Sequence, residues 1–142
     1  MNAYEKLIAD YEAEDIRIFE MEFKAQSNGY CKGKDIIIRN SLDTTTKHCV
    51  LAEELGHYYT TTGEIYRQDT VTYIKEELKG RRWAYERAVP FQRLLDIVKT
   101  GYECVYEIAE FFNVTEQFLI DAILYYQSKF GENFYEIHRQ SV

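Results

Sequence analysis

The chain has 142 residues, of which 24 are acidic and 17 basic, so its formal net charge is −7. This length predicts one compact domain, and a content of 46% hydrophobic and 29% charged residues excludes the disordered class. The longest apolar run, Ala122 to Tyr126, is far shorter than the roughly twenty residues of a transmembrane helix. We therefore expect no membrane partner.

The cysteines and the charge predict the compartment and exclude one class of partner. The three cysteines are scattered and form no Cys-x-x-Cys pair, which indicates free thiols in a reducing compartment. Residues 1–6 contain no basic segment that leads into an apolar stretch, so we expect no secretory signal and a cytoplasmic protein. An acidic chain repels phosphate backbones, so we expect no direct nucleic-acid partner.

The first third of the chain predicts one helix and a small sheet. Apolar residues recur at helical spacing over residues 3–13, and a pattern of period two over 16–23 is typical of a half-buried strand. Two glycines within 27–35 indicate tight turns around a short strand. The β-branched run 36–39 predicts another strand. Together these segments predict an antiparallel sheet of two or three strands.

From residue 45 onward the hydrophobic period is helical. Asp43 and the threonines after it are N-cap candidates for a helix over 45–59. An irregular loop is expected at 61–70, and a second helix over 71–89 should end just before Pro90. Three further helices are predicted at 91–99, 102–112 and 115–129. The fold class is therefore α+β, as a single domain over 1–142, with a helix and the sheet in 1–43, two motif helices in 44–90 and the C-terminal helices in 91–142.

The stretch 106–124 has the pattern of a helix-turn-helix unit. Asn113 stands at the turn, and Thr115 is the N-cap candidate of the second helix. From Tyr102 to the end, however, seven residues are acidic and two are basic, a net charge of −5. We expect a packing unit rather than a DNA reader, and we expect His138 to be a surface residue.

The segment from His48 to Tyr59 concentrates the residues that can carry chemistry. At about 100° per residue, apolar side chains surround most of this helix and leave Glu53, Glu54 and His57 in one polar arc. A helix that is apolar nearly all round is buried, and buried charges are costly unless they are paired or bind metal. Glu53 and His57 have the i, i+4 spacing of two ligands for one metal ion. Glu54, beside them, is a candidate general base.

Two interpretations apply to Glu77, which lies on the second motif helix. Small residues lie beside Glu77, which would let this helix approach the first one and bring the carboxylate to a shared ion. Alternatively, Glu77 forms an ordinary surface ion pair with Arg81 at i+4. His48 and Cys49 are poor further ligands, because Cys49 lies about 12 Å along the helix from His57 and His48 lies about half a turn away.

Two motifs resemble a known family. The hexapeptide Ala52-Glu53-Glu54-Leu55-Gly56-His57 resembles the A-H-E-L-G-H form of the zinc-peptidase signature, in particular that of the ImmA/IrrE-type metallopeptidases. The segment from Glu77 to Pro90 resembles the E-x-x-x-x-x-x-A-x-E-x-x-x-P helix of that family, and the stretch 108–115 fits its closing part. The resemblance covers roughly residues 15–128 and implies a helical, zincin-like domain packed on the sheet.

The chain departs from this family pattern at Glu53, where the first histidine usually stands. If the roles of the family's motif residues are carried over to the matching positions, the resemblance implies that Glu53, His57 and Glu77 bind a divalent metal. It also implies that Glu54 is the general base. The implied ion is zinc, and a set of one histidine and two carboxylates also suits manganese. The residue that stabilises the transition state stays open among Tyr58, Tyr59, Tyr66, Tyr73 and Arg81.

The resemblance implies a metal-dependent endopeptidase that acts on a partner protein. Relatives cleave a helix-turn-helix repressor of a phage or other mobile element, so such a repressor is the expected substrate. The alternative is a catalytically inactive regulator that keeps the peptidase fold and binds a repressor or a toxin–antitoxin partner. The metal content of the purified protein would separate the two.

Overall fold

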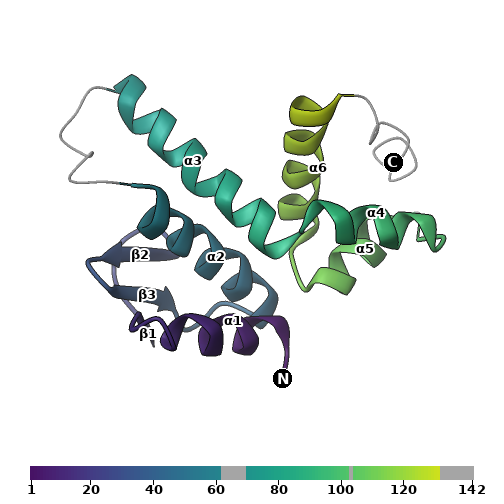
Figure 1. Cartoon of the computed structure of the whole chain (residues 1–142). Coiled ribbons are helices and arrows are strands. Elements are labelled where there is room, and N and C mark those ends of the chain that lie inside the picture. Colours follow the sequence, from purple (N-terminus) through teal and green to yellow (C-terminus); the bar gives the residue numbers. More distant parts are fainter. Residues whose placement is uncertain (62–69, 103, 132–142) are drawn as a thin grey trace.

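The computed structural model describes residues 1–61, 70–102 and 104–131 (Figure 1). The expected loop at 61–70, the candidate Tyr66 and the tail residue His138 therefore fall almost wholly outside the described residues. None of the helices in the described ranges is long and apolar enough to cross a membrane. The elements in chain order are α1 (Ala3–Glu12), β1 (Arg17–Met21), β2 (Gly29–Lys32), β3 (Asp35–Arg39), α2 (Thr44–Thr60), α3 (Thr70–Ala88), α4 (Phe91–Lys99), α5 (Val105–Phe112) and α6 (Glu116–Phe130).

The α+β class and the predicted helices and strands are confirmed, but the predicted antiparallel direction of one strand is wrong. The sheet order is β1-β3-β2, with β2 antiparallel and β1 parallel to β3, so the sheet is mixed rather than antiparallel. A tight turn at Gly33, with φ of +60°, makes β2 and β3 a hairpin. The chain after β1 passes to the far side of β3 before it begins β2, and β1 is left parallel on the opposite edge. A period of two fixes which side chains share a face, but it does not fix the direction of pairing.

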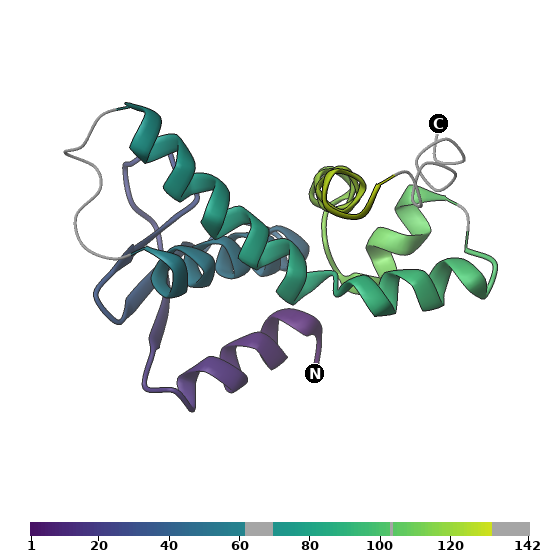
Figure 2. The same cartoon turned by 45° about the horizontal axis from the view of Figure 1, so that its top comes forward.

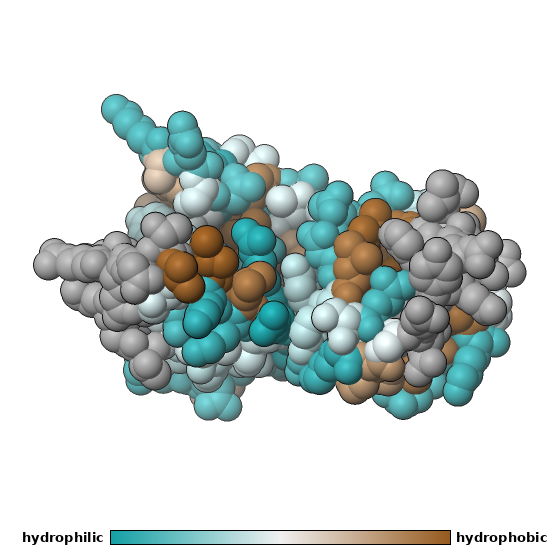
Figure 3. All heavy atoms as spheres, turned by 90° about the horizontal axis from the view of Figure 1, so that it is seen from above, coloured by the Kyte–Doolittle hydropathy of each residue, from teal (hydrophilic) through white to brown (hydrophobic). Residues whose placement is uncertain are grey.

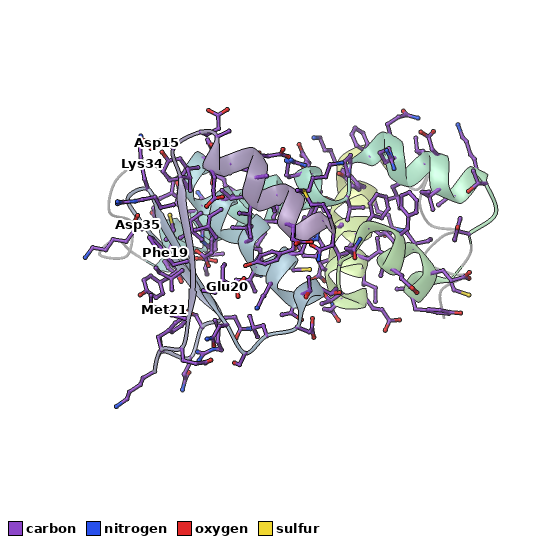
Figure 4. The ribbon with its side chains drawn as sticks, turned by 90° about the horizontal axis from the view of Figure 1, so that it is seen from below. Asp15, Phe19, Glu20, Met21, Lys34 and Asp35 are labelled. Carbon is purple, nitrogen blue, oxygen red and sulfur yellow. The ribbon has the colours of Figure 1, made fainter. Side chains whose placement is uncertain are left out.

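One face of the sheet packs on the helices, and β1 forms an outer edge. Ile36 and Ile38 on the central strand are completely buried. On β1, Figure 4 shows Phe19 and Met21 on the side away from the helices and Glu20 on the opposite side. Glu20 accepts hydrogen bonds there from the Tyr4 hydroxyl, at 2.6 Å, and from Lys47 Nζ, at 2.7 Å. These two bonds join β1 to α1 and α2.

Helix α2 lies at the centre of the N-terminal part of the fold. It contacts α1, α3, β2 and β3, and Figure 2 shows it between the sheet and α3. The Asp43 carboxylate begins the helix by accepting a hydrogen bond from Thr46 N at 2.7 Å. Leu51, Ala52 and Leu55 are completely buried, as expected for a helix that is apolar around most of its circumference.

The two motif helices cross where each has a glycine. A Cβ atom on Gly56 would lie 2.1 Å from the carbonyl oxygen of Gly80, and a Cβ on Gly80 would lie 2.3 Å from Cδ2 of His57. Glycine is therefore required at both positions for this crossing, although it is a poor helix former. The prediction that the two helices pack against each other is confirmed.

The C-terminal helices attach to the start of α2 through a tight turn. Asn113 ends α5 in the left-handed conformation, with φ of 57°, and Thr115 caps α6 by accepting a hydrogen bond from Phe118 N. His48 Nδ1 lies 2.8 Å from the Asn113 carbonyl oxygen. His48 thus has a structural partner remote from His57. The helix-turn-helix character of α5 and α6 stays a prediction.

Candidate functional site

The imidazole of His57 lies between two carboxylates from different helices. Its Nδ1 is 3.3 Å from Glu54 Oε1, one turn earlier on α2, and its Nε2 is 3.3 Å from Glu77 Oε2 on α3. The Gly56–Gly80 crossing is what brings α3 within reach of His57. Among the described residues, Glu77 forms an ion pair with His57 and none with Arg81. The structure therefore supports the interpretation in which Glu77 reaches across to α2.

These three side chains are largely withdrawn from solvent. The exposed fractions are 12% for Glu54, 25% for His57 and 27% for Glu77. The hydrogen bond to Glu54 raises the pKa of His57; burial opposes this shift, and the charges of the surrounding glutamates add to it. Without a bound cation, the surrounding glutamates thus favour the protonated form of the imidazole as their counter-charge.

Glu53 lies in the same charge cluster but contributes differently. Burial raises its pKa, the charge of Arg81 opposes the shift, and the charges of Glu54 and Glu77 reinforce it. A buried carboxylate among other carboxylates is costly while it is ionised, unless a cation is close. A positive ion in the site would therefore favour the ionised form of Glu53.

The His57–Glu77 pair places a nitrogen and an oxygen donor at a separation that one metal ion can bridge. His57 Nε2 is buried and makes no hydrogen bond: Glu77 Oε2 is close enough, but it is poorly aligned with the ring nitrogen. Zinc binds nitrogen and oxygen at about 2.0–2.2 Å, so two ligands of a tetrahedral ion lie about 3.3 Å apart. The observed Nε2–Oε2 distance of 3.3 Å equals that separation. The donor atoms of this pair fit a divalent ion.

A complete three-ligand set is not assembled in the structure. Within residues 1–61, 70–102 and 104–131, no group of three His, Cys, Asp or Glu side chains is arranged to hold a metal ion. The structure brings both Glu54 and Glu77 into contact with His57, whereas Glu53 interacts with these residues through its charge. The roles of Glu53, His57 and Glu77 as ligands and of Glu54 as base stay predictions.

The sequence analysis missed the contribution of β2 to this site. A Cβ atom on Gly29 would lie 2.7 Å from Val50 Cγ1 and 3.4 Å from Glu54 Cγ, so the strand backbone lies directly over α2 at the candidate base. A glycine inside a strand often marks such a close approach. That signal was present in the sequence, but the glycine was assigned to a turn.

Only some of the candidates for transition-state stabilisation lie near the cluster. The charge of Glu77 raises the pKa of Tyr73, which lies one turn earlier on α3. Tyr59 instead stacks on Trp83, with ring centroids 5.4 Å apart, and it also contacts the rings of Tyr11 and Tyr58. Of these candidates, Tyr73 and Arg81 therefore interact with the carboxylates of the cluster, whereas Tyr59 belongs to an aromatic cluster.

The chain is thus an α+β protein in which two crossing helices place a histidine between glutamates from both helices. The chain matches the family model of the M78 peptidases, described as the IrrE N-terminal-like domain, over residues 11–123. This match covers more than three quarters of the chain, so the chain belongs to that family. The family has a metallopeptidase-type function, which uses a divalent metal and a protein substrate. No curated protein and no solved structure matches the chain.

Proposed function

We propose that this chain is a metal-dependent endopeptidase that cleaves a partner protein. The observation that carries the proposal is the buried His57 Nε2, which has no hydrogen bond and lies 3.3 Å from Glu77 Oε2. Buried polar atoms nearly always have a partner. A metal ion would satisfy this one and would also relieve the repulsion between the surrounding carboxylates.

Each residue of the cluster has a distinct role in this proposal. His57 and Glu77 hold the ion, and Glu53 completes the ligand set. Zinc is the proposed ion and manganese the alternative, because two carboxylates make a harder donor set than two histidines. When bound, the ion supplies an acidified water molecule and polarises the scissile carbonyl.

Glu54 is the proposed general base. One of its oxygens contacts His57 Nδ1, which keeps the ring oriented with Nε2 toward the metal side. The other oxygen would accept the proton of the attacking water and pass it to the leaving amine. Its low exposure strengthens its electrostatic interactions with other groups in the site.

The surface beside Glu77 suits a peptide substrate. Val71, Ile74 and Leu78 on α3 are exposed apolar residues, and Figure 3 shows hydrophobic side chains gathered on the face of the molecule that includes α3. Such a patch commonly binds apolar side chains of a partner. That the partner is a helix-turn-helix repressor of a mobile element is proposed from the family resemblance.

Melting curves and a cleavage assay test this proposal together. Zinc or manganese added to chelator-treated protein should raise the melting temperature, because a ligand that binds only the native state stabilises it. His57→Ala should abolish the rise. Glu54→Gln should keep the rise but lose cleavage of a peptide library analysed by mass spectrometry, by about 100-fold or more. Glu12→Gln, an exposed acidic residue on α1, is the matched control and should behave as the parent.

A catalytically inactive regulator is the second candidate, and one observation favours it. The described residues present no complete group of three metal ligands. If neither ion shifts the melting temperature, or if Glu54→Gln cleaves as well as the parent, the endopeptidase proposal fails. The regulator would be supported if the parent protein binds no metal and if the parent and Glu54→Gln bind a repressor equally tightly.

A further inference from the structure

A concave region lies at the other end of α2, away from the glutamate cluster. It is a cavity of about 380 Å³ between the start of α1, the junction of α3 with α4, and the end of α5. Figures 1 and 2 both place the N-terminal end of α1 beside this junction. His48 lines the cavity, and nine residues of helix, about 13 Å, separate it from His57. None of Glu53, Glu54, His57 or Glu77 lines it.

Positive side chains converge on this cavity although the chain as a whole is acidic. Lys6, Arg87 and Arg93 line it, together with the single acidic residue Asp10. Arg87 is already neutralised, because its Nη2 lies 2.8 Å from Asp10 Oδ2. Among the described residues, no carboxylate forms an ion pair with Lys6 or Arg93. Two uncompensated cations thus face one cavity in a chain of net charge −7.

The remaining walls of the cavity are apolar and are held in place. Leu7, Pro90, Phe111 and Phe112 contribute to the lining. The guanidinium of Arg93 lies over the Phe111 ring, 5.5 Å from its centroid, so an aromatic contact positions this cation at the wall. His48 is only 5% exposed, and its contact with the Asn113 carbonyl fixes its ring. The site is therefore partly preorganised before any ligand enters.

We infer that this cavity binds a small organic anion, with an apolar, ring-sized body against Phe111 and Phe112 and a carboxylate or phosphate group between Lys6 and Arg93. The volume of the cavity lies within the range of small-molecule sites, about 300–1,000 Å³. Charge-assisted hydrogen bonds from lysine and arginine are the usual means of holding both anionic groups. This inference uses no residue of the candidate peptidase site and does not depend on the proposed function.

A ligand in this cavity would join parts of the chain that are far apart in the sequence. Lys6 belongs to α1, Arg93 to α4 and the phenylalanines to α5. Binding would therefore clamp the N-terminal helix to the C-terminal helices and stabilise the native state.

Calorimetric titration of the full chain with four defined compounds tests the inference. Phenyl phosphate and benzoate carry both the ring and the anion, inorganic phosphate carries only the anion, and benzyl alcohol carries only the ring. We expect one of the two aromatic anions to bind with a stoichiometry of one and to raise the melting temperature, at least tenfold more tightly than inorganic phosphate or benzyl alcohol. Comparison of phenyl phosphate with benzoate identifies the preferred anionic group.

Three charge-neutralising variants locate the site. Lys6→Gln and Arg93→Gln should each weaken binding about tenfold or more, the effect of losing one charge-assisted hydrogen bond. Lys99→Gln makes the same change in net charge on α4 but lies outside the cavity lining, and it should bind as the parent does. Lys6 and Arg93 are exposed, so the variants should fold, which their melting curves without ligand verify.

The inference is overturned if neither aromatic anion binds the parent at millimolar concentration. It is also overturned if Lys99→Gln weakens binding as much as Arg93→Gln does, since the attraction would then be non-specific, or if neither cavity variant changes the affinity.

Discussion

The imidazoles of His48 and His57 lie on one helix, yet their surroundings shift their pKa values in opposite directions. His57 faces glutamates, which favour its charged form. His48 is buried beside a backbone carbonyl, and burial lowers its pKa; the hydrogen bond to Asn113 opposes the shift and the charge of Arg87 adds to it. Residue type alone therefore does not predict the charge of a histidine at neutral pH.

The lowered pKa of His48 predicts a pH dependence of stability. Below about pH 6.5, the ordinary histidine pKa, the unfolded chain takes up a proton at His48 that the folded chain does not. The free energy of unfolding should therefore fall as the pH is lowered through this range. His48→Gln, whose amide can still donate to the Asn113 carbonyl, should remove this contribution.

Urea unfolding of the parent and of His48→Gln at pH 7.5 and pH 5.5 measures the effect. The relevant quantity is the fall in the free energy of unfolding between the two pH values, compared between the parent and the variant. The contributions of carboxylates that titrate in both proteins cancel in this comparison. A variant that loses as much stability on acidification as the parent would contradict the burial of a neutral His48.

At the scale of elements, the close crossing of α2 and α3 controls the candidate site. A methyl group at Gly56 would overlap the Gly80 backbone, and the backbone of a packed helix cannot move aside as a flexible side chain can. Gly56→Ala gains about 1 kcal/mol of helix propensity but overpacks the crossing. We expect it to destabilise the protein by about 1–3 kcal/mol net and to weaken metal binding, since Glu77 would move away from His57.

Chemical denaturation measures the stability of Gly56→Ala, and titration with zinc measures its metal affinity. Lys75→Ala on the exposed side of α3 is the control and should change the free energy of unfolding by less than about 0.5 kcal/mol. Equal stability of Gly56→Ala and the parent would show that the helices tolerate a wider separation.

At the scale of the whole molecule, the distribution of charge predicts that the chain does not bind DNA. The region from Tyr102 onward carries a net charge of −5, and Lys129, one of its two cations, is already paired with Glu86 at 3.2 Å. A helix-turn-helix reader needs lysine or arginine to contact phosphates. The cavity lined by Lys6 and Arg93 is a local concavity and does not form the extended basic surface that binds DNA phosphates.

Fluorescence anisotropy with a labelled DNA duplex at 50 mM and 150 mM salt checks this prediction. We expect no saturable binding at micromolar protein concentrations in either salt. Binding that weakens steeply between the two salt concentrations would instead show that the C-terminal helices contact the phosphate backbone.

Local patterns in the sequence were enough to predict the helices, the class of fold and the residues proposed for the candidate site. The caps at Asp43 and Thr115, the break at Pro90 and the apolar periodicity of α2 act between residues a few positions apart. Such local interactions are visible in the sequence. The Glu-Glu-x-x-His spacing likewise fixed the relative positions of Glu53, Glu54 and His57 on one helix.

Contacts between distant segments could not be predicted from local patterns and became visible in the folded chain. The parallel pairing of β1, the closeness of Gly29 to Glu54 and the choice of His57 over Arg81 as the partner of Glu77 each depend on how whole elements pack. The cavity lined by Lys6 and Arg93 has the same origin, because these two cations lie 87 positions apart in the sequence. Hydrophobic periodicity shows which face of an element is buried, but the partner of that face is set by the packing of the complete core.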